Sequence, residues 1–531
     1  MTLLFRGGRV WLGPGRTTSA LAVRDGRIAA LGDDALALRA DETVDLDGGL
    51  LLPAYSDGHA HPVQGGVELA GPAVHGCTGV DEVVSAVSSY ALTHPEADWI
   101  TGGGYDPALA PDGAFDARWL DAAVGDRPVL LHATDHHTVW CNTRALALAG
   151  IDAATPDPVD GVILRRADGT PLGTLREPAA YGLVTRLAPP ATRADQMAGL
   201  AAACASMAAF GVTWMQDAWV EDGGHRPYLD LLAAGGLSVR TNLAFVLEPG
   251  TWREALPRVR EQRAEVEAAG LPLMLSGRTV KFFADGVIEA GTGALLEPYA
   301  DSPGRGIALW EADELAAAVA RADALGFQTH VHAIGDAAVR TALDAIEHAI
   351  AVNREWDRRP VVTHVQLVDP ADLPRFAALG VTACFQTYWA QLDDAETRLT
   401  APRLGPERTA RQYPVATLAA LGTRLSLASD WPVSTNDPLE AIVVAATRQT
   451  DGGDPAGGWI PRERLALEDA LAAATAGGAY QGFTDGSRGR IEVGMAADLV
   501  AYDHDWTTGP PLDARAAVVL GTWLDGKRTF G

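Results

Sequence analysis

ADELAAAVARADALG (312–326), QTHVHA (328–333), DAAVRTALDAIEHAIAV (336–352) and PVVTHVQ (360–366) follow one another and decide the fold class. The two longer segments repeat apolar residues at helical spacing, and the two shorter ones are apolar runs of strand length. Strands that alternate with helices indicate a parallel sheet, because each crossover returns the chain to the same edge. This part of the sequence therefore predicts an α/β fold.

The same alternation extends in both directions from this segment. It gives eight predicted strands, which are 55–61, 212–217, 238–245, 278–284, 328–333, 361–366, 381–386 and 424–430. Eight strand–helix units predict a (β/α)8 TIM barrel. A doubly wound open sheet is the alternative for the same pattern.

Both ends of the chain are rich in short strands with Gly and Asp turns, in contrast to the middle. LLFRGGRVWL near the start resembles GRIEVGMAADLVAYD (489–503) near the end in this respect. We therefore expect residues 1–54 and 488–531 to form one small β-sandwich domain, and residues 55–487 to form the barrel domain.

The first two barrel strands are separated by about 150 residues, which is far more than one crossover needs. Residues 62–205 are therefore predicted to hold a large insertion. Since loops at one end of a barrel surround its mouth, we expect this insertion to act as a lid.

The composition excludes several classes of protein. The 68 acidic and 42 basic residues give a net charge of −26, which argues against binding to nucleic acid or to an anionic membrane. No apolar run reaches about 18 residues, so we expect no transmembrane helix. The N-terminus MTLLFRGGRVWLGPG has no secretory signal, and the four cysteines lack CxxC spacing. We therefore expect a cytoplasmic location.

Polar side chains gather where the predicted strands end, which is where TIM barrels place their active sites. His59 and His61 are two apart on one strand, so they point the same way. Neutral imidazole nitrogens suit Zn and similar ions. The residues at these strand ends are His59, His61, Lys281, His330, His332, His364 and Asp430. Together they predict a divalent metal centre.

Lys281 is one of only two lysines, with Lys527, and it lies inside the apolar strand TVKFFADG. An unpaired ammonium is costly there, so a snorkelling or ion-paired lysine is one interpretation. The other is a neutral amine that captures carbon dioxide as a carbamate, a carboxylate-like ligand that bridges two metal ions. Arginine cannot replace lysine in that role, because its guanidinium stays protonated.

The order His-x-His, Lys, His, His, Asp resembles the amidohydrolase superfamily. VKFFADGVIEAGTGALLEPY (280–299), HAIGDAAV (332–339), LASDWPVSTNDPL (427–439) and TDHHTVWCNTRALALAGI (134–151) are similar to amidohydrolase family 3, the branch with enzymes like N-substituted formamide deformylase. The resemblance extends over nearly the whole chain.

The resemblance implies two groups of ligands for divalent ions, most favourably Zn. These are His59, His61 and Asp430 for one ion, and Lys281 as carbamate, His332 and His364 for another. His330 is then expected behind the ligands or in the core. One or two ions are both compatible with the pattern.

The sequence departs from the family pattern at two places. Thr363 precedes His364 where the family often has Glu, and the lid has His136 between Asp135 and His137 where the family often has Gly. We expect His137, Trp140 and Trp431 to contact the substrate. We interpret Glu177 as a solvated surface residue in preference to a residue of the site.

The expected reaction is hydrolysis of a non-peptide C–N bond in an amide or an N-formyl or N-acyl amine. A metal-activated hydroxide would attack, and Asp430 would carry its proton to the leaving amine. One alternative is a deaminase of an aminated ring, which commonly lacks the bridging lysine. Another is a catalytically inactive barrel that only binds other molecules. Such a protein would have no use for the full set of metal-binding residues. We expect a small-molecule substrate and a homodimer.

Overall fold

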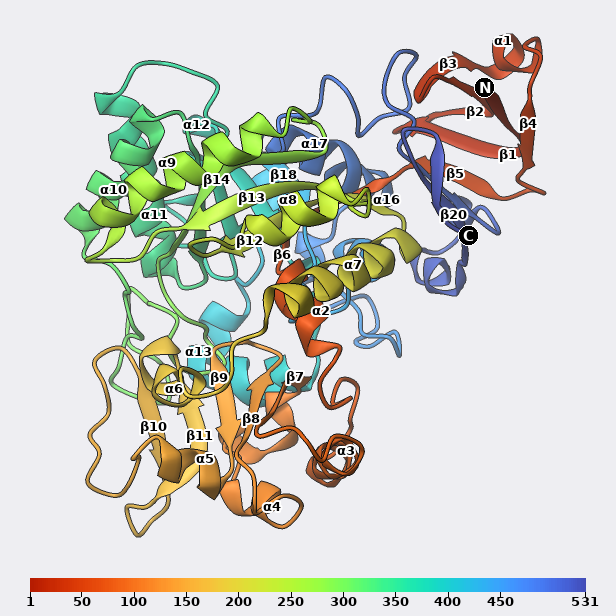
Figure 1. The fold of residues 1–531 in the computed structure, drawn as a ribbon. Coiled ribbons are helices and arrows are strands. Elements are labelled where there is room, and N and C mark those ends of the chain that lie inside the picture. The colour runs from red at the N-terminus through yellow and green to blue at the C-terminus, as the bar shows by residue number, and fades with distance from the viewer.

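The computed structural model describes residues 1–531, which form three sheets (Figure 1). The central sheet has eight parallel strands in the order β18-β17-β16-β15-β14-β13-β12-β6. They are β6 (Tyr55–Ala60), β12 (Val212–Val220), β13 (Arg240–Val246), β14 (Leu275–Phe283), β15 (Gln328–Ala333), β16 (Val361–His364), β17 (Thr382–Phe385) and β18 (Arg424–Leu427). Each of the eight predicted strands is present, and the TIM barrel prediction is confirmed.

The barrel is joined at the carboxyl ends of its first and last strands. There the backbone N–H of Asp430 donates to the carbonyl of His59 at 2.8 Å, and that of His61 donates to Trp431 at 2.7 Å. These two hydrogen bonds join the end of β6 to the segment after β18, and the two strands share no strand ladder. Residues predicted to bind metal therefore take part in closing the barrel.

Amphipathic helices cover the outside of the barrel. Helix α11 buries Val339, Leu343 and Ile346, whose spacing of three and four places them on one face. The helices from the end of the insertion onward are α7 (Arg193–Ala209), α8 (Arg226–Ala233), α9 (Trp252–Ala268), α10 (Ala312–Ala324), α11 (Asp336–Val352), α12 (Leu373–Ala378), α13 (Ala401–Thr409), α14 (Val415–Ala420), α15 (Pro438–Thr447), α16 (Leu467–Ala472) and α17 (Gly478–Gln481). None of the helices is long and apolar enough to cross a membrane.

Strands from both ends of the chain share a second sheet, in the order β21-β20-β19-β5-β1-β2-β3, with β4 also paired to β1 (Figure 1). They are β1 (Thr2–Gly13), β2 (Arg16–Arg24), β3 (Arg27–Leu31), β4 (Glu42–Asp45), β5 (Leu50–Pro53), β19 (Leu499–Tyr502), β20 (Val519–Leu524) and β21 (Lys527–Phe530), with the short helix α1 (Gly32–Leu36) after β3. The antiparallel pairing of β5 with β19 joins the two ends, as expected. The exact domain limits at 54 and 488 stay a prediction.

A buried ion network attaches this sheet to the barrel. Asp498 accepts from Arg240 at 3.0 Å and from Arg488 at 3.3 Å, and all three side chains are buried. Arg488 also donates to Ser56 in β6 at 2.9 Å. Because each buried charge is paired, the cost of taking it out of water is offset.

The third sheet lies in the predicted insertion and has the order β10-β11-β9-β8-β7. Its strands are β7 (Ile100–Tyr105), β8 (Val129–Ala133), β9 (Thr138–Cys141), β10 (Val162–Arg165) and β11 (Pro171–Arg176), with helices α2 (Pro62–Glu68), α3 (Val80–Thr93), α4 (Ala117–Asp121), α5 (Thr143–Leu148) and α6 (Pro178–Thr185). Figure 1 shows the orange and yellow strands of this sheet, with α3 to α6, as a separate layer beside the barrel, whereas α2 lies against α7. They bring the start of β9 and the end of β11 to the barrel mouth.

Candidate metal centre

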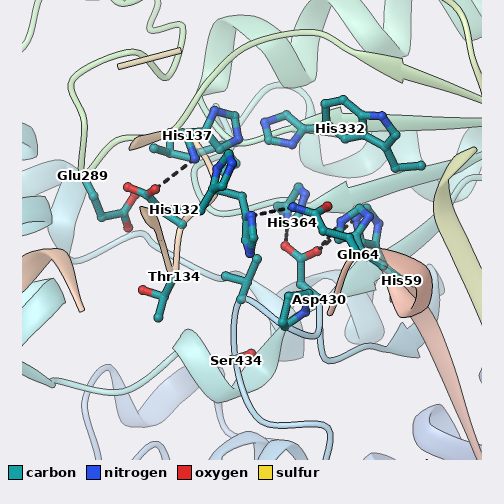
Figure 2. A pocket seen from close by; sticks show the side chains of 18 of the residues that line it. His59, Gln64, His132, Thr134, His137, Glu289, His332, His364, Asp430 and Ser434 are labelled. Carbon is teal, nitrogen blue, oxygen red and sulfur yellow. Dashed lines mark hydrogen bonds and ion pairs between the residues drawn. The ribbon is translucent and has the colours of Figure 1, made fainter. Parts of the chain in front are cut away.

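The predicted ligands converge at the carboxyl ends of the barrel strands (Figure 2). His59, His364 and Asp430 are buried and have ligand atoms within 4.8 Å of one another. Oδ1 of Asp430 lies 3.2 Å from Nε2 of His59 and 2.9 Å from Nε2 of His61. Three histidines, His59 and His61 at the end of β6 and His364 at the end of β16, thus surround one carboxylate.

Unpaired polar atoms show that this cluster fits a cation. Nδ1 of His61 is buried and has no hydrogen-bond partner, and Oδ1 of Asp430 lies close to two imidazole nitrogens without the geometry of a hydrogen bond to either. Burial alone would raise the pKa of Asp430, but its close contact with the His61 ring and the charge of that ring hold the pKa below its ordinary value. Imidazole nitrogen with an ionised carboxylate is a donor set that suits Zn.

Two ligand positions have strained backbones. Asp430 has φ 56° and His364 has φ 74°, in the left-handed region that only a few per cent of non-glycine residues adopt, with Asp and His among the more frequent. Such strain gathers at functional sites, where the surroundings hold the residue in place. The turn at Asp430 aims its carboxylate back at the end of β6.

Three of the four proposed ligand rings, all except that of His61, have their other nitrogen held by a neighbour, which fixes their orientation. Nδ1 of His59 lies 2.8 Å from Nε2 of His330, and Nδ1 of His364 lies 2.9 Å from the Gln386 side-chain oxygen. Nε2 of His332 lies 3.2 Å from the carbonyl of Gly286. His330 thus lies behind a ligand, as expected, whereas Gln386 was not singled out in the sequence.

Asp285 organises the turn that follows β14. Its carboxylate lies 3.4 Å from Nε2 of His332 and accepts backbone N–H groups of Ala294, Ile334 and Gly335 at 2.8, 3.0 and 2.8 Å. The turn is therefore tied to the end of β15, where His332 lies. Asp285 lies only four residues after Lys281, yet no spacing rule marks it out.

Lys281 lies in β14 with no exposed surface and makes no ion pair. Its Nζ is 3.5 Å from Nε2 of His59 and 4.3 Å from the centre of the Phe283 ring. Burial lowers the pKa of Lys281 to about 7, against the opposite effect of Asp430. Neither snorkelling nor ion pairing describes this lysine, and its amine lies among the ligand imidazoles.

A cavity of about 1230 Å³ opens above the cluster, and His137 and Trp431, which are predicted to contact the substrate, line it. Trp140 does not line this cavity. It is fully buried in the core of the insertion, where it packs 4.9 Å from Phe115 and donates from Nε1 to the carbonyl of Asp116 at 3.1 Å. The structure thus gives Trp140 a packing position in place of the expected substrate contact.

Glu177 is fully buried, so its interpretation as a solvated surface residue is wrong. Its carboxylate lies 2.9 Å from Nδ1 of His137 and also accepts from the hydroxyl of Thr292. Burial alone would lower the pKa of His137, but the Glu177 carboxylate raises it to about 9. Burial likewise opposes ionisation of Glu177, and His137 holds its pKa below the ordinary value. The two form a buried ion pair.

His136, at the position where the family often has Gly, borders the same cavity. Its Nδ1 lies 2.7 Å from the Gln64 side-chain nitrogen, and its Nε2 lies 3.5 Å from the carboxylate of Glu68. The rings of His132 and His136 stack with centres 5.5 Å apart. Burial raises the pKa of Glu68 to about 8. The extra imidazole is thus part of a polar cluster beside the metal centre.

Comparison with known proteins agrees with this geometry. A family model described as "Amidohydrolase family" matches residues 42–530. The chain belongs to the amidohydrolase family. The resemblance drawn from the sequence is confirmed.

This amidohydrolase is similar to proteins with different names. It is 31% identical to Protein LONG AFTER FAR-RED 3 of Arabidopsis thaliana over 96% of this chain and 88% of that protein. It is 26% identical to the N-substituted formamide deformylase of Arthrobacter pascens over 96% and 94% of the two chains. An uncharacterized metal-dependent hydrolase of Pyrococcus furiosus has a similar solved structure, with a TM-score of 0.71, 26% identity, and 96% and 100% coverage.

Family membership and the buried cluster of His59, His364 and Asp430 together support a metal-dependent hydrolase. The metal, the number of ions and the bond that is cleaved stay predictions.

Proposed function

We propose that this amidohydrolase cleaves the C–N bond of an N-formyl or N-acyl amine with the help of Zn or a similar divalent ion. The observation that carries the proposal is the Asp430 carboxylate, which is buried between the rings of His59 and His61 with Oδ1 unpaired. A divalent ion held there acidifies water and polarises a carbonyl group.

The six ligands would come from five of the eight barrel strands or the residues directly after them. They are His59, His61, Lys281 as carbamate, His332, His364 and Asp430. Carbamate formation joins the neutral amine of Lys281 to the carbon of carbon dioxide and releases one proton. The position of Nζ, 3.5 Å from His59, supports a role as a ligand shared between two ions.

Asp430 would act as the proton carrier. An ionised carboxylate can take the proton of the attacking water and give it to the leaving amine. Its contact with His61 supports this role, because it keeps the carboxylate ionised. His137, on the side of His332, would donate a hydrogen bond to the acyl oxygen as negative charge develops there.

Two observations support this substrate class. The relative from Arthrobacter pascens is named an N-substituted formamide deformylase. The cavity is large and has aromatic walls, which include Phe283, Tyr388 and Trp389, so it can accept an apolar amine substituent. Trp431 forms a further part of the wall and is proposed to contact the substrate.

A panel of N-formyl and N-acyl amines, incubated with Zn-loaded enzyme, tests the proposal. Release of the substituted amine would support it. Ammonia release from an aminated ring would favour a deaminase, which Lys281 argues against. Purified protein without metal, unaffected by chelator, would favour a barrel that only binds ligands.

A further inference from the structure

A second polar arrangement lies beside the metal ligands and joins the insertion to the barrel. His137 precedes β9, Glu177 follows β11, and Thr292 lies in the turn after β14. The backbone N–H of Glu177 donates to the carbonyl of His137 at 2.8 Å, and its side chain holds Nδ1 of the same residue at 2.9 Å. Glu177 therefore forms hydrogen bonds with both the backbone and the ring of His137.

The backbone of Glu177 is strained to make these contacts. Its φ of 67° and ψ of 154° lie in a region that is essentially restricted to glycine. Such a conformation costs about 1–3 kcal/mol and persists only where the surroundings hold it. A residue used only to fill space would have no need of this conformation.

Gly286 leaves room for the carboxylate on the barrel side. A Cβ at Gly286 would lie 2.4 Å from Oε1 of Glu177 and 2.3 Å from the Thr292 hydroxyl, so a side chain is excluded. The carbonyl of Gly286 meanwhile holds Nε2 of His332 at 3.2 Å. One turn of the barrel thus orients His332 directly and His137 through Glu177.

His137 consequently has one nitrogen free for a ligand. Nδ1 is occupied by Glu177, and Nε2, on the other side of the ring, makes no hydrogen bond within the chain. The ring borders the cavity, with its centre 5.5 Å from that of His332, and Figure 2 shows the two rings facing each other. An oxygen atom bound beside His332 lies within reach of this donor.

We propose that Glu177 is a positioning residue, which aims Nε2 of His137 at the acyl oxygen of the substrate. The inference rests on the proposed amide hydrolysis and assigns the His332 side of the cavity to the acyl group. It leaves the aromatic part of the cavity for the amine substituent. The insertion then contributes to bond cleavage through one residue pair and is more than a cover.

The test compares Glu177→Gln, His137→Gln and the double variant, with the exposed Glu96→Gln of the insertion as control. With a substrate from the panel, we expect Glu177→Gln to lower kcat about 10- to 100-fold at nearly unchanged KM and metal content. The double variant should be no slower than His137→Gln, because Glu177 acts through His137. Glu96→Gln should match the wild type.

Two results would overturn the inference. One is a wild-type kcat in Glu177→Gln. The other is a double variant whose loss of kcat is the product of the two single losses. A kcat of Glu177→Gln that falls only in step with metal content or Tm would likewise indicate a purely structural residue.

If no panel compound is turned over, the proposed function fails and the positioning role is tested separately. In protein with ¹⁵N-labelled histidine, the His137 imidazole signals are those lost in His137→Gln. We expect Glu177→Gln to shift them and to leave the signals of the other 12 of 13 histidines in place. Unshifted His137 signals would overturn the inference.

Discussion

The backbone N–H of Asp430 donates to the carbonyl of His59 at 2.8 Å, while the Asp430 carboxylate lies 3.2 Å from the ring of the same histidine. The two residues are thus joined through both backbone and side chain at the point where the barrel closes. A substitution that preserves the size of the Asp430 side chain should therefore keep the architecture and change only the chemistry.

Asp430→Asn removes the carboxylate that we propose as the proton carrier. We expect it to retain metal and to lower kcat by about 10²- to 10⁴-fold, the usual contribution of a general acid or base. Metal analysis and steady-state kinetics of the same preparation check both parts. Near-wild-type turnover would rule out this role for Asp430.

Lys281→Arg keeps a long cationic side chain but cannot form a carbamate. We expect it to lose the second metal ion and most of the activity, as measured by metal content and kinetics. Lys527→Arg is the matched control, because Lys527 is the only other lysine in the chain and lies exposed at the start of β21.

The same pair of variants tests the modification directly. Protein equilibrated with ¹³C-bicarbonate should show a single carbamate carbon signal that persists in Lys527→Arg and is absent in Lys281→Arg. A fully metallated Lys281→Arg protein would contradict the bridging role.

The His137–Glu177 pair should make stability depend on pH. The pKa of Glu177 is lowered, so its contribution is present above the unfolded value of 4.5 and is lost as pH falls through the folded value. The pKa of His137 is raised from 6.5 to about 9, so its contribution is full below 6.5 and is lost as pH rises through 9. The pair therefore stabilises most between pH 4.5 and 6.5.

Thermal unfolding of wild type and Glu177→Gln across pH checks this window. We expect the wild type to be more stable by on the order of 1–3 kcal/mol near pH 6, with the difference shrinking toward pH 9. If the difference in stability between the two proteins is constant from pH 6 to 9, then Glu177 does not stabilise the protonated form of His137.

Two tryptophans separate packing from substrate contact. Trp140→Ala should cost about 3–5 kcal/mol of stability, because it empties a core position, while the surviving folded enzyme keeps its KM. Trp431→Ala should instead raise KM, because Trp431 borders the cavity. Denaturant unfolding and substrate titration of both variants test the contrast. A raised KM in Trp140→Ala, with an unchanged KM in Trp431→Ala, would contradict it.

The barrel could be predicted because apolar residues recur at a different spacing in helices than in strands, and because the strand–helix unit repeats eight times. The strand limits were less accurate where the chain turns sharply. β18 ends at Leu427, whereas the prediction extended it to Asp430, because the left-handed backbone that ends the segment has no clear sequence signal. The residues predicted as ligands could be singled out because they recur at the ends of five predicted strands, and the structure brings them to one end of the barrel.

The supporting residues could not be predicted in the same way. Glu177 and Gln386 reach the site from distant segments, and only the tertiary structure shows which histidine each one holds. Trp140 lies next in sequence to β9 residues at the mouth, yet the alternation of side chains along that strand turns it into the core of the insertion. Within the insertion, closeness in sequence to a residue at the barrel mouth thus did not predict which side chains line the cavity.

The hydrogen bonds at the ends of β6 and β18 also set an order of events during folding. His59 and Asp430 come from opposite ends of the barrel sequence, so bringing them together carries the entropic cost of closing a very long loop. An incompletely folded chain presents only scattered imidazoles, which hold an ion weakly. We therefore expect uptake of an ion to be a late event in maturation, which would shift the equilibrium toward the closed barrel.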